Sequence, residues 1–141
     1  MSRYLALDYG EKRIGVAVTD PSRVLASPLE FIDGTSFNKG VAQIKKLIEV
    51  YEVSLIVIGI PRNMDGSYGP AADKVREFVA RLKERILVPV KTMDERLTTV
   101  EASRRLQEAG KNTRKQKTKI DSASAVIILQ TYLDAEAGPL L

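Results

Sequence analysis

The alternation of hydrophobic and polar residues divides the chain into short strands followed by strands that alternate with helices. Runs that are apolar, or that alternate with period two, predict strands at residues 4–8, 14–19, 24–31, 55–60 and 88–93. Apolar residues that recur every three or four positions predict helices at residues 36–51, 70–82, 98–109 and 120–133. The basic stretch 111–119 that precedes the last helix is expected to be a loop.

This order of elements predicts an α/β fold with a mixed five-stranded sheet. The first three strands are joined by tight turns and form a meander in which strand two is antiparallel to its neighbours. The later strands arrive by helical crossovers, which are right-handed by strong preference. Pro28 and Pro89 have no N–H for a strand ladder, which places the third and fifth strands at the edges. The expected sheet order is 3-2-1-4-5, with helices on both faces, in one domain that spans residues 1–141.

Two residue types are absent from the composition, and this narrows the possible chemistry. The 141 residues include no Cys and no His, which excludes thiol nucleophiles, Ser-His-Asp triads and zinc sites built on either residue. Carboxylates are the remaining metal ligands, and they favour hard cations such as Mg²⁺ or Mn²⁺. There is no signal-peptide layout and no apolar run that approaches ~20 residues, so we expect a cytoplasmic protein that does not contact membranes.

Four acidic residues are candidates for the chemistry. Asp8 ends the central strand, Asp94 and Glu95 follow the fifth strand, and Asp121 falls in the first turn of the last predicted helix. Ligands bind at the carboxyl edge of open sheets of this kind. Each acid taken singly could serve a turn, a helix end or an ion pair. Together they would repel one another and would need a cation. Two oxygen-bound metals about 4 Å apart can promote in-line displacement at a phosphate.

Basic and glycine positions are expected to contact a nucleic-acid backbone. The net charge of +4 is only weak support for an anionic partner. Segment 110–119 carries five positive charges and no acid, and it leads directly to Asp121. Such a run is commonly only solvated surface, but beside an acidic cluster we favour a phosphate clamp. The expected nucleic-acid-binding residues are Gly10, Lys12, Arg13, Arg62, Arg96, Lys111, Arg114, Lys115, Lys117 and Lys119.

Four motifs, in order along nearly the whole chain, resemble those of the YqgF family. They are LDYGEKRIGVA from Leu7, GIPRNMDG from Gly59, DERLTTVEA from Asp94 and KIDSASA from Lys119. Members of this family are bacterial proteins described as pre-16S rRNA nucleases and Holliday junction resolvases. The resemblance implies a ribonuclease-H-like fold, a Mg²⁺ or Mn²⁺ requirement and a role in RNA processing or DNA repair. It also implies that the catalytic acids are Asp8, Glu95 and Asp121.

The fourth strand departs from the pattern of the wider ribonuclease-H-like superfamily. Nucleases of that superfamily commonly carry an acid at the end of this strand, whereas here it ends in Gly59, Ile60 and Pro61. A substitute must come from the fifth strand, roughly 10 Å from the first at ~4.8 Å between neighbouring strands. Glu95 has the reach to turn inward and Asp94 less so, which makes Asp94 the less favoured metal ligand. Asp65, on the loop after strand four, is a further candidate.

Several functions are compatible with these features. The favoured one is a metal-dependent nuclease that hydrolyses phosphodiester bonds, in processing of the 5′ end of pre-16S rRNA. A Holliday junction resolvase in DNA recombination or repair is the first alternative, and a non-catalytic RNA-binding module in ribosome assembly is the second. Asp8-x-Gly10 also resembles the first phosphate loop of actin-like ATPases, but these need a second similar domain. We expect a monomer or a weak homodimer.

Overall fold

The computed structural model describes residues 2–63, 65–95 and 114–137, and their side chains except those of residues 114–122. Within this range the strands are β1 (Arg3–Asp8), β2 (Arg13–Thr19), β3 (Ala26–Asp33), β4 (Val53–Ile60) and β5 (Val90–Asp94). The helices described are α1 (Phe37–Val50), α2 (Pro70–Lys83) and α4 (Arg114–Ala137). The helix predicted at residues 98–109 lies outside the described residues.

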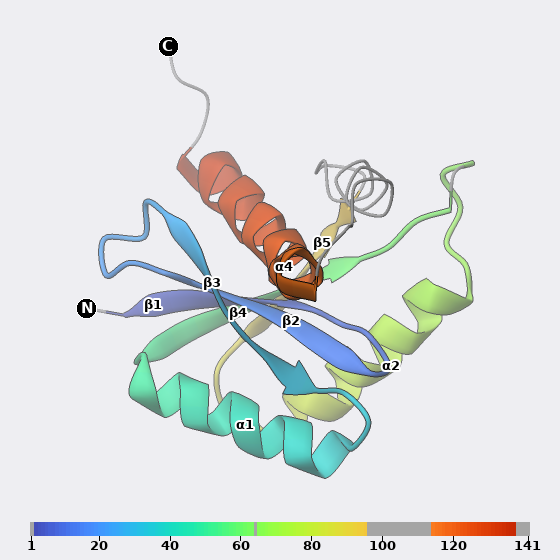
Figure 1. The fold of residues 1–141 in the computed structure, drawn as a ribbon, viewed down its shortest axis with the longest axis horizontal. Coiled ribbons are helices and arrows are strands. Elements are labelled where there is room, and N and C mark those ends of the chain that lie inside the picture. The colour runs from blue at the N-terminus through green and yellow to red at the C-terminus, as the bar shows by residue number, and fades with distance from the viewer. Residues whose placement is uncertain (1, 64, 96–113, 138–141) are drawn as a thin grey trace.

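The strands form one sheet in the order β3-β2-β1-β4-β5, which confirms the predicted order (Figure 1). Strand β2 is antiparallel to β1 and to β3, and Asp8 at the end of β1 pairs with Gly15. Strand β4 is parallel to both β1 and β5, with Leu7 paired with Ile58 and Gly59 paired with Met93. The carboxyl ends of β1, β4 and β5 therefore meet at one edge of the sheet.

Alternate residues of the central strands point to opposite faces of the sheet, and different helices cover the two faces. Leu5 and Leu7 belong to a core with buried residues of α1 and α2. Ala6 belongs to a second core, with Val57 and residues of α4 such as Ile128. Figure 1 shows α4 on one side of the sheet and α1 and α2 on the other. Helices on both faces were predicted, and this is confirmed.

Strand β3 begins two residues later than predicted, and Asp20 explains the shift. The Asp20 carboxylate accepts hydrogen bonds from the backbone N–H groups of Val24, at 2.8 Å, and of Leu25, at 2.9 Å. These two residues are therefore part of a turn rather than of a strand ladder. The edge position that Pro28 predicted for this strand is confirmed by the sheet order.

Helix α4 begins at Arg114, so the predicted loop at residues 111–119 is wrong over residues 114–119. Arg, Lys and Gln are good helix formers, and no Gly or Pro interrupts this segment. The sequence interpretation took the start of the apolar pattern at Ile120 for the start of the helix. Asp121 consequently lies seven residues beyond the first residue of α4, in its third turn and not in its first.

Helix α2 begins where its local sequence predicts. Pro70 occupies the first position of the helix. A backbone N–H at that position would have no intrahelical acceptor, so proline costs no hydrogen bond there. The buried stripe of α2 faces the sheet and consists of Ala72, Val75, Phe78, Val79 and Leu82. The helix thus starts beside the carboxyl edge of β4. None of the helices among the described residues has the length and apolar character needed to cross a membrane.

Candidate active site

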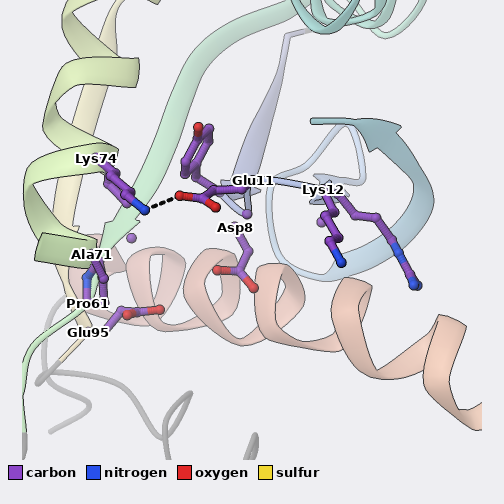
Figure 2. A pocket seen from close by; sticks show the side chains of 13 residues that line it. Asp8, Glu11, Lys12, Pro61, Ala71, Lys74 and Glu95 are labelled. Atoms are coloured by element: carbon purple, nitrogen blue, oxygen red, sulfur yellow. Dashed lines mark hydrogen bonds and ion pairs between the residues drawn. The ribbon is translucent and has the colours of Figure 1, made fainter. Parts of the chain in front are cut away.

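A cavity of about 670 Å³ lies at the carboxyl edge of β1 and β4 (Figure 2). Its walls come from the β1–β2 hairpin, the end of β4, the start of α2 and the residue that follows β5. Asp8 and Glu95 both line it, together with Lys12 and Arg13 of the hairpin. The cavity thus combines acids from two strand ends with two cations of the hairpin.

Asp8 is held by the last ladder pair between β1 and β2. Its partner Gly15 also lines the cavity. Because strand side chains alternate, Asp8 lies on the same face as Ala6, two residues earlier. Ala6 packs in the core formed with α4. Asp8 therefore faces the side of the sheet that α4 covers.

Glu95 reaches the same cavity by crossing β4 at Gly59. It is only 6% exposed, although a carboxylate is rarely buried to this degree. Its Cγ atom lies 3.2 Å from the point that a Cβ atom would occupy on Gly59, and Cδ1 of Ile128 lies 2.7 Å from the same point. Figure 2 shows the Glu95 side chain extending toward the strand that carries Asp8. Because Gly59, near the end of β4, has no side chain, the Glu95 side chain can pass over the strand at this point.

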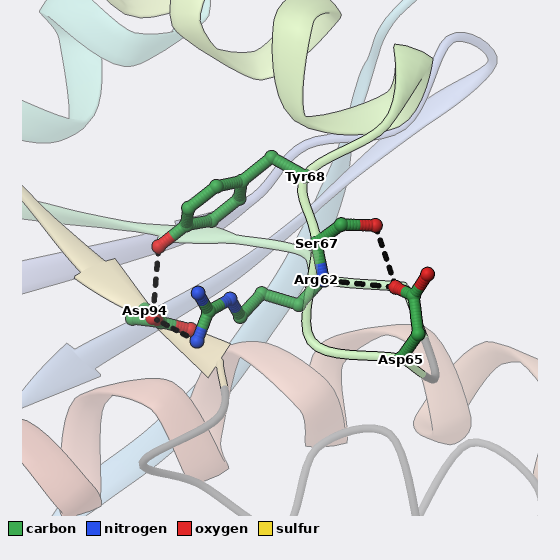
Figure 3. Close-up of polar contacts among 5 residues, drawn as sticks. All are labelled: Arg62, Asp65, Ser67, Tyr68 and Asp94. Atoms are coloured by element: carbon green, nitrogen blue, oxygen red, sulfur yellow. Dashed lines mark hydrogen bonds and ion pairs between the residues drawn. The ribbon is translucent and has the colours of Figure 1, made fainter.

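Asp94 points to a different cluster, on the loop between β4 and α2. One carboxylate oxygen of Asp94 lies 3.2 Å from Nη1 of Arg62 and accepts a hydrogen bond of 2.9 Å from the Tyr68 hydroxyl (Figure 3). The Asp94 side chain is 19% exposed and that of Arg62 is 16% exposed. Glu95 lines the cavity beside Asp8, and Asp94 does not.

Arg62, which the sequence suggested as a nucleic-acid contact, is held within this cluster. Its guanidinium lies 4.4 Å from the centre of the Tyr68 ring, as does that of Arg76. Such cation–π contacts, together with the ion pair to Asp94, hold the Arg62 side chain against the protein. It does not line the cavity that holds Asp8 and Glu95.

Asp65, the further candidate on this loop, closes a local turn. Its carboxylate accepts hydrogen bonds from the Ser67 hydroxyl and from the Ser67 backbone N–H, the latter at 2.9 Å. These two hydrogen bonds, the hydroxyl first, lower the pKa of Asp65 below its ordinary value. The residue is exposed and lies outside the lining of the cavity.

Gly10, Lys12 and Arg13 line the cavity along the hairpin. A Cβ atom on Gly10 would lie 2.5 Å from the backbone oxygen of Arg13, so the tight turn requires glycine there. The Arg13 guanidinium is placed 5.4 Å from the centre of the Phe31 ring. The turn thus places Lys12 and Arg13 on the wall of the cavity that also holds Asp8.

Two residues of the cavity, Lys74 and Glu11, were not identified from the sequence. Lys74 of α2 donates a hydrogen bond to Glu11 of the hairpin and forms an ion pair with it. This contact lowers the pKa of Glu11 and raises that of Lys74. The only sequence signal for Lys74 is its place in the second turn of a helix that starts at the carboxyl edge of the sheet.

The remaining predicted residues lie beyond the described side chains. Arg96 and Lys111 fall outside the described residues. Lys115, Lys117, Lys119 and Arg114 are described only as backbone of α4, and so is Asp121. Asp121 precedes Ala125 by four residues and Ile128 by seven, the spacing of one helical face. Ala125 and Ile128 belong to the buried residues of α4 that pack in the second core.

The donors in the cavity are of the kind that hold hard divalent cations. Among the described side chains, no group of three or more acids is placed to hold a metal ion. Asp8 and Glu95 supply two carboxylates within one cavity. Carboxylate oxygens suit Mg²⁺ and Mn²⁺. This donor set therefore fits such a cation, with room for a further ligand.

Two relatives are similar to this chain over nearly its whole length. A protein of Lactobacillus gasseri named "Putative pre-16S rRNA nuclease" is 48% identical over 137 residues, covering 94% of this chain and 96% of that protein. A protein of Thermoanaerobacter pseudethanolicus with the same name is 47% identical over 135 residues, covering 95% and 97%.

A solved structure has the same fold. RuvC of T. thermophilus in complex with a Holliday junction substrate superposes with a TM-score of 0.64 at 12% identity, and the match covers 98% of this chain and 97% of that one. This likeness confirms the predicted ribonuclease-H-like fold. The sequence from residue 2 to residue 135 matches the RuvX family, which is described as Holliday junction resolvase. The chain therefore belongs to the RuvX family.

Proposed function

We propose that this protein is a divalent-metal-dependent nuclease that hydrolyses phosphodiester bonds in nucleic acid, with pre-16S rRNA as its substrate. The observation that carries the proposal is that Asp8 and Glu95 line one cavity, at the edge of the sheet where ligands of such folds bind. Two relatives that are 47–48% identical over nearly their full length carry the name of this activity.

In this proposal Asp8, Glu95 and Asp121 hold Mg²⁺ or Mn²⁺, and Asp94 takes no direct part. The cation would activate water and offset the charge of the phosphate. The protein itself aligns the acids: the β1–β2 ladder orients Asp8, and the gap at Gly59 admits Glu95. The absence of histidine is consistent with this chemistry because no imidazole base is needed.

The nucleic acid would approach along the hairpin. Gly10 and Gly15 of the hairpin line the cavity beside Asp8, and Lys12 and Arg13 supply positive charge on the same wall. Arg96, Lys111 and the basic residues at the start of α4 remain proposed phosphate contacts. We propose that the protein acts in the cytoplasm.

Cleavage of branched DNA is a second candidate function, favoured by the description of the matched family as Holliday junction resolvase. Symmetric cutting of a four-way junction would require two active sites and hence a dimer. The same acids would serve in both reactions. The two candidate functions, cleavage of pre-16S rRNA and cleavage of branched DNA, therefore differ in substrate and share one reaction chemistry.

A cleavage assay tests both functions. End-labelled structured RNA and a four-way DNA junction are incubated with Mg²⁺, with Mn²⁺ or with EDTA. The proteins are the wild type, Asp8→Asn and Asp73→Asn, the last a matched control at an exposed position of α2. We expect metal-dependent products from the wild type and the control, and none from Asp8→Asn. Undiminished cleavage by Asp8→Asn would contradict the proposed site, and the preferred substrate would identify the function.

A further inference from the structure

The ion pair between Glu11 and Lys74 stands at the junction of two cavities. Both residues line the cavity that holds Asp8, and both also line a second cavity of about 300 Å³. The second cavity runs from Tyr9 toward the start of α1, and Phe37, Phe78 and Arg81 are among its lining residues. Figure 2 shows the pair spanning from α2 to the hairpin. The pair therefore separates the candidate active site from a neighbouring space.

This pair is an exposed contact that is easily exchanged. The side chain of Lys74 is 57% exposed and that of Glu11 is 62% exposed. Ion pairs between exposed side chains contribute little to stability, because water solvates both charges and each side chain loses freedom. A stronger anion that enters the cavity can thus replace Glu11 as the partner of Lys74. A phosphate is such an anion, and lysine is a common phosphate ligand.

Lys74 faces the cations of the hairpin across the cavity. Lys12 and Arg13 lie on the hairpin wall, whereas Lys74 lies on the wall formed by α2. A strand bound beside Asp8 would therefore meet positive charge from two sides. In the second cavity Arg81 is held with its guanidinium 3.8 Å from the centre of the Phe37 ring. Arg81 thus offers a further cation past the ion pair, although the acid Glu77 also lines the second cavity.

We propose that Lys74 is a substrate-binding residue that contacts a backbone phosphate next to the cleaved one, and that this phosphate displaces Glu11. The displaced pair opens the passage between the cavities, and the neighbouring nucleotide occupies the second cavity. This inference rests on the proposed nuclease function. In this proposal the Glu11 carboxylate forms the ion pair with Lys74 in the free protein, and the phosphate of the substrate takes its place.

Binding and kinetics of matched variants test the inference. Affinity for structured RNA is measured in EDTA, without cleavage, over a series of salt concentrations, and KM and kcat are measured in Mg²⁺. The variants are Lys74→Ala, Glu11→Gln and Lys83→Ala, where Lys83 is an exposed lysine of α2 that lines neither cavity. Loss of one charged phosphate contact predicts about tenfold weaker binding by Lys74→Ala.

The salt dependence and the kinetics identify the contact. The slope of log affinity against log salt should fall in magnitude by about 0.7 to 0.9 in Lys74→Ala, the value for one lost phosphate contact. Its KM should rise more than its kcat falls. Glu11→Gln should bind more tightly than the wild type, because the competing anion is removed. Lys83→Ala should match the wild type in every measurement.

Three results would overturn the inference, and they are distinguishable. If Lys74→Ala and Lys83→Ala bind and cleave alike while the wild type is active, Lys74 is no substrate ligand and the proposed function stands. If Glu11→Gln weakens binding as Lys74→Ala does, Glu11 positions Lys74 and the proposed exchange is wrong. If the wild type neither binds nor cleaves RNA or DNA, the proposed function fails and this inference with it.

Discussion

The Cγ atom of Glu95 lies 3.2 Å from the position that a Cβ atom would take on Gly59. The two residues belong to neighbouring segments of the sheet edge, because Gly59 pairs with Met93 and Glu95 follows two residues later. This contact explains how an acid from beyond the fifth strand reaches a cavity centred on the first. Glycine at the end of β4 is thus part of the architecture of the site.

Replacing Gly59 by alanine should impair both stability and cleavage. The new methyl group would stand 2.7 Å from Cδ1 of Ile128 as well as beside Glu95, and neither neighbour can stay where it is. Overpacking of this kind costs about 1–3 kcal/mol in a well-packed interior. Chemical denaturation should detect that loss, and kcat should fall because the Glu95 carboxylate is displaced.

A second substitution separates these two effects. Ile128→Val removes the Cδ1 atom and leaves the Glu95 contact untouched, so the double variant Gly59→Ala/Ile128→Val should regain part of the lost stability. Its kcat should stay low. Recovery of kcat together with stability would show that Gly59 serves packing alone.

Glu95→Gln and Asp94→Asn should have different consequences, although the residues are adjacent. Glu95→Gln removes a carboxylate from the cavity and should reduce metal-dependent cleavage to the level seen in EDTA, with the fold kept. Asp94→Asn weakens the partly buried contact with Arg62 and should lower stability by about 1–3 kcal/mol, the range for a charged partner left unsatisfied. Cleavage assays and chemical denaturation of both variants test these expectations. Full activity in Glu95→Gln would exclude Glu95 as a metal ligand.

The sheet was predictable from the sequence because its determinants are local. Period-two alternation marks β2, the apolar run marks β4, and Pro28 marks β3 as an edge strand. Pro89 was predicted to lie within the fifth strand, but β5 begins one residue after it. The strand order follows from short turns and right-handed crossovers, which leave few alternatives. The error at α4 also has a local cause. The sequence interpretation relied on apolar periodicity to find the start of the helix, and a run of basic helix formers lacks that signal.

The side-chain partners within the site were not predictable, because they join distant segments. Lys74 and Glu11 are 63 residues apart, and Arg62 and Asp94 come from different elements. The sequence suggested that Glu95 could turn inward but contained no sign that Gly59 provides the path. That path depends on the register between β4 and β5, which no local pattern specifies. Arg62 was expected to face nucleic acid because its contact with Tyr68 could not be foreseen.

The turn before β3 should lose stability in acid through Asp20. The Ser22 hydroxyl, followed by the backbone N–H groups of Leu25 and Val24, lowers the pKa of Asp20 from 3.8 to about 2. A lowered pKa means that the ionised form stabilises the fold above pH 3.8, and that this contribution disappears as the pH falls through about 2. Asp20→Asn should therefore be less stable than the wild type at pH 7, and the difference should shrink toward pH 2. A difference independent of pH would show that the Asp20 charge plays no part.

Divalent metal should stabilise the wild type more than the variant Asp8→Asn, which lacks one carboxylate of the cavity. In EDTA the carboxylates of Asp8 and Glu95 share one cavity and repel each other, so Asp8→Asn should be at least as stable as the wild type. A cation that binds only the folded protein adds about 2.7 kcal/mol when its concentration is a hundred times its Kd. The melting temperature of the wild type and of Asp73→Asn should thus rise with Mg²⁺ or Mn²⁺, whereas that of Asp8→Asn should barely respond. An equal rise in all three proteins would place the bound cation elsewhere, and the acids at the sheet edge would then need another explanation.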